Sequence, residues 1–360
     1  MHGSPETSPV ALALLGLARR RVRAHSRSAE YYQSADRFSE AFLGRTFQVE
    51  PDYYLAVGTD YSAIDWLYEE LGQDATLSRA TLESVTHGLQ DMTRPGPAHA
   101  ALGPLEAALQ DASCSLLDVC RALLGAITVL GQDTLRARGL PDRLLQDWLS
   151  LWSERVWKQN SQQARLTLLI QVMQARPEDR PGRMAALGQG REAWDAPGRH
   201  FEQGVRGYLE QYAETGASSV ALVGGLPFAR ALSPEAFEQM LGLLRGGQDF
   251  LGEVARLLRF AQDVRFDPSE PLNSGVMGHA AEHQLSLLDV QAARLPREEL
   301  DARLRRQWAE DSTKARSALD AAVASLGDAP LRPLLQGFVK SVQAVATRLA
   351  EAGHEPRPGV

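Results

Sequence analysis

Residues 113–139, SCSLLDVCRALLGAITVLGQDTLRARG, decide the fold class of this chain. Apolar side chains recur through this run at helical spacing, and Gly139 ends it as glycine often ends a helix. A second helix is expected over 140–175, where Trp148 and Trp152 lie on one apolar stripe. Two long helices joined by a short connection favour a helical bundle.

The helical pattern continues over most of the 360 residues. We expect further helices at 9–26, 28–43, 51–73, 78–92, 99–111, 193–215, 218–230, 233–264, 274–293, 296–327 and 329–352. The best strand candidate, 217–226, has helical neighbours, and breaks are expected at 93–97 and 176–192. The sequence therefore predicts an all-α protein with one helical domain at 9–352, a disordered N-terminus at 1–8 and a flexible tail at 353–360.

Composition excludes several classes of function. The formal net charge is −7, which argues against a nucleic-acid binder because such a protein needs a basic face. No run reaches the roughly 20 apolar residues of a membrane span, and the arginines near the N-terminus follow the apolar stretch instead of preceding it. Cys114 and Cys120 are interpreted as buried thiols in a reducing compartment. We therefore expect a cytoplasmic protein.

Two short patterns leave alternatives open. HAAEH at 279–283 places His279, Glu282 and His283 in the order found in inverted zinc proteases, but so short a match favours an amphipathic helix with two polar histidines. In YLEQYAETGASSVALV at 208–223, Gly216 marks either a helix break that turns backbone carbonyls toward a cavity or a simple turn between helices.

The segment RFAQDVRFDPSEPLNSGV at 259–276 combines carboxylates with arginines. Asp263, Asp267 and Glu270 are oxygen donors of the kind that Mg²⁺ prefers, and Arg259 can hold a phosphate oxygen. The other interpretation is the solvated end of a helix followed by a loop.

Three segments in this order resemble class I terpene synthases. Residues 259–276 resemble the second metal-binding motif of that family, and 208–223 resemble the effector helix that precedes it, as in bacterial diterpene synthases of the ent-kaurene type. EPDYYLAVGTDYSAIDWLYEELG at 50–72 lies where the family has its aspartate-rich helix. Within the second motif, the matching residues are Arg259, Asp263, Glu270, Asn273 and Ser274.

The sequence also departs from the family pattern. Tyr68 and Glu69 stand where the first two aspartates are expected, Gln262 replaces the usual asparagine, and Phe266 replaces a serine or threonine ligand. Tyr212 stands at the position of the effector arginine. These departures put the strength of metal binding in doubt.

The resemblance implies the class I terpenoid synthase fold, a helical bundle around a central apolar cavity. It implies a lyase of isoprenoid biosynthesis that uses Mg²⁺ to ionise an allylic prenyl diphosphate, with a C20 chain as one candidate, and guides the carbocation to a hydrocarbon or alcohol; a homodimer is compatible with it. The implied metal ligands are Glu69, Glu70, Asp263, Asp267 and Glu270, the implied catalytic positions are Arg259, Tyr212 and Gly216, and the implied cavity residues are Tyr61, Trp66, Trp148, Trp152 and Phe260.

An alternative follows from the altered motifs. A protein with the same fold and no remaining metal site would act as a non-catalytic binding or partner subunit. The two hypotheses differ in whether Glu69 and Glu270 matter for activity.

Overall fold

A computed structural model describes residues 9–25, 36–37, 39–74, 77–174, 176, 178–179, 217–245, 250, 252–254, 257–258 and 297–352. Twelve helices and no strand occur in this described part of the chain, so the predicted all-α class is confirmed there. None of the described helices is long and apolar enough to cross a membrane.

The N-terminal half of the fold contains α1 (Pro9–His25), the π-helix η1 (Glu40–Arg45) and five α-helices. These five are α3 (Pro51–Gln73), α4 (Arg79–Asp91), α5 (Pro95–Gln110), α6 (Leu116–Ala137) and α7 (Asp142–Gln174). The second half contains α10 (Ala217–Gly225), the 3-10 helix η3 (Leu226–Phe228), α11 (Pro234–Arg245), α15 (Arg297–Ser325) and α16 (Arg332–Ala352).

Local signals explain several helix ends. The side chains of Ser78 and Ser115 accept backbone N–H bonds at the starts of α4 and α6, as N-cap serines do. Gly139 ends α6 in the left-handed region with φ 67°, a conformation that glycine adopts without a steric cost. The expected break at 93–97 is shorter than predicted because Pro95 suits the first turn of α5.

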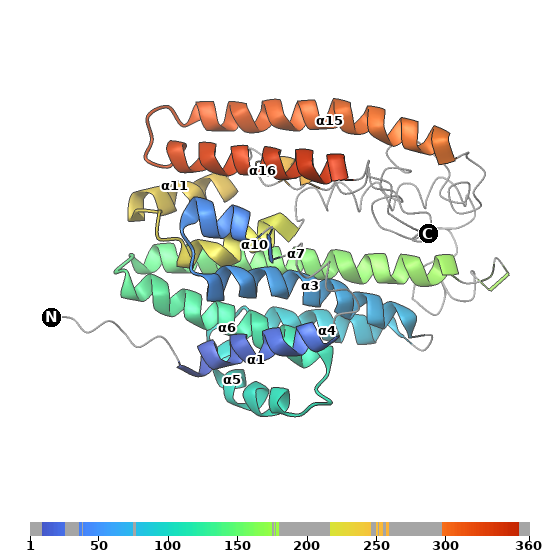
Figure 1. Cartoon of the computed structure of the whole chain (residues 1–360). Coiled ribbons are helices and arrows are strands. Elements are labelled where there is room, and N and C mark those ends of the chain that lie inside the picture. The colour runs from blue at the N-terminus through green and yellow to red at the C-terminus, as the bar shows by residue number, and fades with distance from the viewer. Residues whose placement is uncertain are drawn as a thin grey trace.

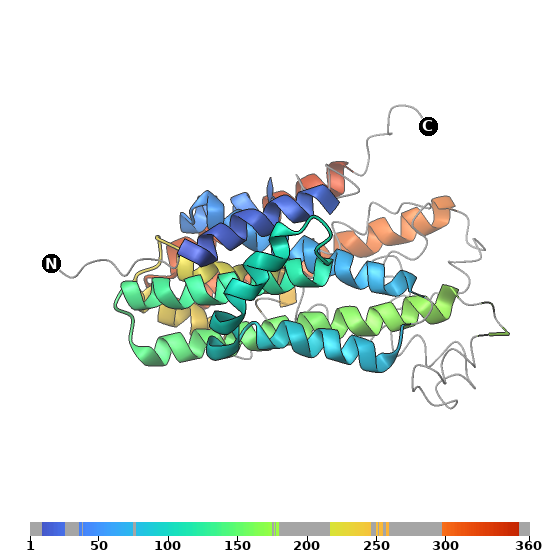
Figure 2. The same cartoon turned by 90° about the horizontal axis from the view of Figure 1, so that it is seen from below.

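The helices stack in layers (Figure 1). α1 and α5 pack on one side of α6, and α3, α4, α6 and α7 form a central group in which α3 runs parallel to α7. α10 packs on α3 and α7, and the pair α15 and α16 covers the opposite side, where α16 touches η1. The view from below shows α1 and α5 crossing the central helices (Figure 2).

The core is continuous across these layers. Trp148 and Trp152 on α7 are fully buried, and their rings are stacked with centroids 6.4 Å apart. The indole N–H of Trp148 donates to the Val223 carbonyl at 2.8 Å, and that of Trp152 donates to the Thr128 hydroxyl at 2.9 Å. These contacts join α7 to α10 and to α6.

Candidate functional site

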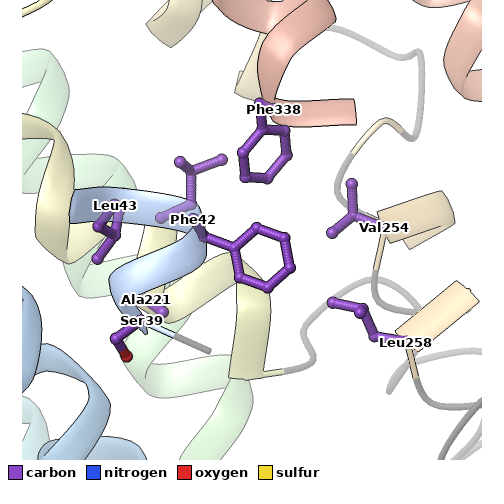
Figure 3. Close-up of a pocket in the computed structure, with 8 residues that line it drawn as sticks. Ser39, Phe42, Leu43, Ala221, Val254, Leu258 and Phe338 are labelled. Atoms are coloured by element: carbon purple, nitrogen blue, oxygen red, sulfur yellow. The ribbon is translucent and has the colours of Figure 1, made fainter. Parts of the chain in front are cut away.

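An apolar pocket lies between η1, α10, α16 and the segment around residues 254–258 (Figure 3). It has room for about one water molecule. All but one of its lining side chains are apolar, and they come from Ser39, Phe42, Leu43, Ala221, Leu222, Val254, Leu258 and Phe338. The pocket thus joins segments that are far apart in the sequence.

The π-helix η1 places two of these side chains. Phe42 and Leu43 are buried, although η1 is only one turn long, and short π-helical turns are rare and frequent at functional sites. Gly225 permits this arrangement, because a Cβ there would lie 2.7 Å from the Leu43 methyl carbons. Any larger residue at this position would force the Leu43 side chain or η1 to shift.

Aromatic rings gather around Phe338 on α16. Its ring centroid lies 5.6 Å from that of Phe42, 5.8 Å from that of Phe47 and 6.0 Å from that of Phe250. The rings of Phe42 and Phe338 project into the pocket from opposite sides (Figure 3). A group of aromatic rings of this kind suits contact with a hydrocarbon chain, and the ring faces also attract positive charge.

Ser39 supplies the one polar side chain of the pocket. It is 1% exposed, and its hydroxyl has no hydrogen-bond partner. A buried hydroxyl without a partner is uncommon because it forfeits hydrogen bonds to water. This oxygen can therefore receive or donate a hydrogen bond to a molecule in the pocket.

A second buried region lies inside α3, α4, α6 and α7. Among the side chains that the structure describes, all buried polar ones except Ser39, Thr93 and Ser312 belong to these four helices: Thr59, Asp60, Ser62, Thr86, Thr128, Gln132, Gln159, Asn160, Gln163 and Thr167. Ligand sites of helical bundles are commonly built from such inward-facing side chains.

Tyr68 bridges this interior. Its hydroxyl lies 2.9 Å from the Thr86 hydroxyl on α4, and burial raises its pKa well above the usual range. Thr167 on α7 donates to the Tyr68 carbonyl at 3.0 Å. The Tyr68 side chain is therefore a buried phenol of the core that joins α3 to α4.

The two carboxylates that follow Tyr68 are exposed. Glu69 and Glu70 lie near the end of α3, and Asp65 precedes Glu69 by one turn on the same face. The Gln163 amide donates to Asp65 at 3.0 Å, which fixes the orientation of that carboxylate. These oxygen donors fit Mg²⁺ in type.

The other residues predicted from the sequence divide into two groups. Trp66 on α3 is partly buried against the core, and Trp148 and Trp152 are packed within it. Tyr61 belongs to α3, and its role in a cavity stays a prediction. Outside the described residues lie Tyr212, Gly216, Arg259, Phe260, Asp263, Asp267, Glu270, His279, Glu282 and His283.

Within the described ranges, no group of three or more His, Cys, Asp or Glu side chains is placed to hold a metal ion. The structure therefore leaves the pairing of Glu69 with Asp263 as a prediction, because Asp263 lies beyond those ranges.

Sequence reasoning missed the apolar pocket and the buried carboxyl of Asp60. Phe338 and Ser39 are unremarkable in the sequence, because only the packing of α16 on η1 brings them together. Asp60 could have been found, because it lies on the apolar stripe of α3 between Val57 and Ile64, where a carboxyl is unusual.

No protein-family model matches the chain, and no curated protein or solved structure matches it either.

Proposed function

We propose that this chain acts as a class I terpene synthase, ionising an allylic prenyl diphosphate with Mg²⁺ and guiding the carbocation to a hydrocarbon or alcohol. One observation carries the proposal: the aromatic pocket is lined by residues of the effector-like segment 208–223 and by a residue next to the second metal-binding motif. Ala221 and Leu222 belong to α10, which begins directly after Gly216, and Leu258 immediately precedes Arg259.

The apolar end of a substrate would occupy this pocket. Phe42 and Phe338 offer ring faces to an apolar chain and to positive charge developing on it. Apart from Ser39, the lining side chains are apolar and offer water no hydrogen bond. Such a lining would protect a reactive cation from early capture by water. The pocket would have to widen on binding, because it has room for about one water molecule as it stands.

The diphosphate end would be held near the end of α3. Asp65, Glu69 and Glu70 would contribute oxygen ligands, together with Asp263 and Glu270. Bound Mg²⁺ would stabilise the departing diphosphate as a Lewis acid. Gln163 would keep Asp65 in a fixed orientation, which is the usual role of an outer partner of a metal ligand.

The test is turnover. The purified chain is incubated with geranyl, farnesyl or geranylgeranyl diphosphate and Mg²⁺, and extracted products and released diphosphate are measured. Glu69→Gln/Glu70→Gln should reduce release strongly, whereas Glu83→Gln, at an exposed position of α4 that pairs with Arg79, should not. Phe42→Leu should change the product mixture. Absence of release with all three substrates would refute the proposal.

A non-catalytic binding protein is the second candidate. It is favoured by Tyr68, which occupies the position of a metal ligand yet is turned into the core toward Thr86. Calorimetry separates the two functions: the second predicts binding of a prenyl diphosphate or its alcohol without turnover, and no effect of Glu69→Gln on that binding.

A further inference from the structure

Asp60 is a buried carboxyl in the middle of α3. It is 1% exposed, and neither carboxylate oxygen has a hydrogen-bond partner. Its helix neighbours Val57 and Ile64 belong to the apolar core. An ionised carboxylate in such surroundings is unfavourable unless something pairs with it.

The helix register places Asn160 close to the same level. α3 and α7 run parallel, and the bonds from Gln163 to Asp65 and from Thr167 to the Tyr68 carbonyl set an offset of 98 to 99 residues. By that offset Asn160 lies within about one turn of Asp60. Asn160 is fully buried, and both its amide oxygen and its amide nitrogen lack partners.

Cys120 on α6 belongs to this layer as well. α6 and α7 are antiparallel, since Trp152 binds Thr128 while Trp148 lies against Gly131, and the same progression brings Asn160 level with Cys120. Burial raises the pKa of the Cys120 thiol, and the Asp60 and Glu70 carboxyls raise it further. A carboxyl, a carboxamide and a thiol thus share one buried layer.

Within the described part of the chain, Asp60 takes part in no hydrogen bond or ion pair. Burial raises the pKa of Asp60 well above its usual range and is the sole cause of that shift. The ionisable groups on the surrounding elements have partners of their own. On α6 and α7, Arg121 pairs with Asp118, Arg136 with Asp133 and Lys158 with Glu154, and Arg155 donates to the Leu244 carbonyl. Arg19 of α1 binds Thr59 and faces Asp36, Asp65 and Tyr68 of α3 bind Gln163 and Thr86, and Glu40 and Arg45 of η1 pair with each other. α10 contains no ionisable side chain.

We propose that Asp60 is a proton-binding site inside the bundle, a neutral carboxylic acid that internal water links to the Asn160 amide. Water suits the layer because a carboxylic acid and a carboxamide each offer both donors and acceptors, and no direct bond joins them. Mg²⁺ or Ca²⁺ suits it less, because either ion needs about six oxygen ligands and the amide N–H₂ and the thiol cannot supply them.

The expected pH dependence has a definite sign. The folded protein keeps the Asp60 proton above pH ~4, where the unfolded chain releases it. Folding therefore takes up a proton, and stability falls as the pH rises from about 4 toward the folded-state pKa. Relative to Asp60→Asn, the unfolding equilibrium constant of the native chain should rise about tenfold per pH unit across that window.

Urea unfolding from pH 4 to 9 tests this slope. Asp52→Asn is the matched control, since Asp52 is an exposed carboxyl on the same helix and should give no such slope relative to the native chain. Equal pH profiles for the native chain and Asp60→Asn would overturn the proposal. A profile that changes with added Na⁺ or Mg²⁺ only when Asp60 is present would overturn it in favour of a cation site.

Infrared spectroscopy gives an independent readout if Asp60→Asn unfolds. The native protein at pH 7 should show the carbonyl band of a protonated carboxylic acid that exchanges slowly in heavy water, and Asn160→Ala should shift that band because its hydrogen-bonding changes. A native spectrum at pH 7 without a protonated-carboxyl band would overturn the proposal.

Discussion

Around Phe338, side chains from η1, α10 and α16 enclose a single unpartnered hydroxyl, whereas the interior of α3, α4, α6 and α7 buries amides, hydroxyls and a carboxyl. In the interior, the polar groups that have partners fix how the helices align, as the Tyr68–Thr86 pair does between α3 and α4. Around Phe338, the helices are aligned by ring packing and by the close contact between Gly225 and Leu43. The difference shows that hydrogen bonds align the helices in the polar interior, whereas shape and ring packing align them around Phe338.

The largest expected effect concerns Trp148, which connects the two regions. Its indole binds the Val223 carbonyl of α10 and fills the space over Gly131 of α6. Trp148→Ala should reduce the free energy of unfolding by about 3–5 kcal/mol. Trp157→Ala is the control, because Trp157 is 37% exposed and should cost less than about 1 kcal/mol in urea unfolding. Similar losses for both variants would mean that the regions do not depend on this connection.

The second effect concerns the partnered polar groups. Thr86→Val removes the hydroxyl beside Tyr68 and leaves a buried phenol O–H without a partner, so it should cost about 1–3 kcal/mol. Tyr68→Phe/Thr86→Val removes both partners and should recover part of that loss. Chemical unfolding of the two single variants and the double variant measures this coupling. Additive losses would show that the pair does not hold α3 to α4.

A third effect separates a close contact from open space. Gly225→Ala places a Cβ 2.7 Å from Leu43 and should destabilise the protein by about 1–3 kcal/mol. Gly242→Ala, at an exposed position in the last turn of α11, meets no atom within 4 Å and should stabilise the protein by about 0.5 kcal/mol. Thermal unfolding of both variants checks the opposite signs, and a neutral Gly225→Ala would mean that η1 moves freely away from α10.

The helices could be predicted because their signals are local. Periodicity predicted 51–73, which α3 matches at both ends, and the start expected at 296 lies one residue before α15. The expected helix at 28–43 was only partly right, since the described chain there contains the π-helix η1 at Glu40–Arg45. A π-helix leaves no distinctive period in so short a run of sequence. The π-helical conformation of η1 therefore depends on its packing against α16.

The pocket could not be predicted, because it depends on which helices meet. Phe42 and Phe338 are almost 300 positions apart in the chain, and no spacing rule relates them. For the predicted metal ligands, the limit is which residues the structure describes. Glu69 and Glu70 lie on the surface of α3, while their predicted partner Asp263 remains a prediction from the motif alone.

The smallest effect tests the lone hydroxyl of the apolar region. Ser39→Ala removes a buried oxygen that has no partner and keeps the shape of the side chain nearly unchanged, so it should stabilise the protein by about 1 kcal/mol. Ser233→Ala is the matched serine control, because the Ser233 hydroxyl caps α11 by accepting from Ala236 N–H and its loss should cost about 1 kcal/mol. Thermal unfolding compares the two signs. If Ser39→Ala instead lowers the melting temperature, the hydroxyl already has a partner, which would most simply be a water molecule in the pocket, and the pocket would then be a hydrated site.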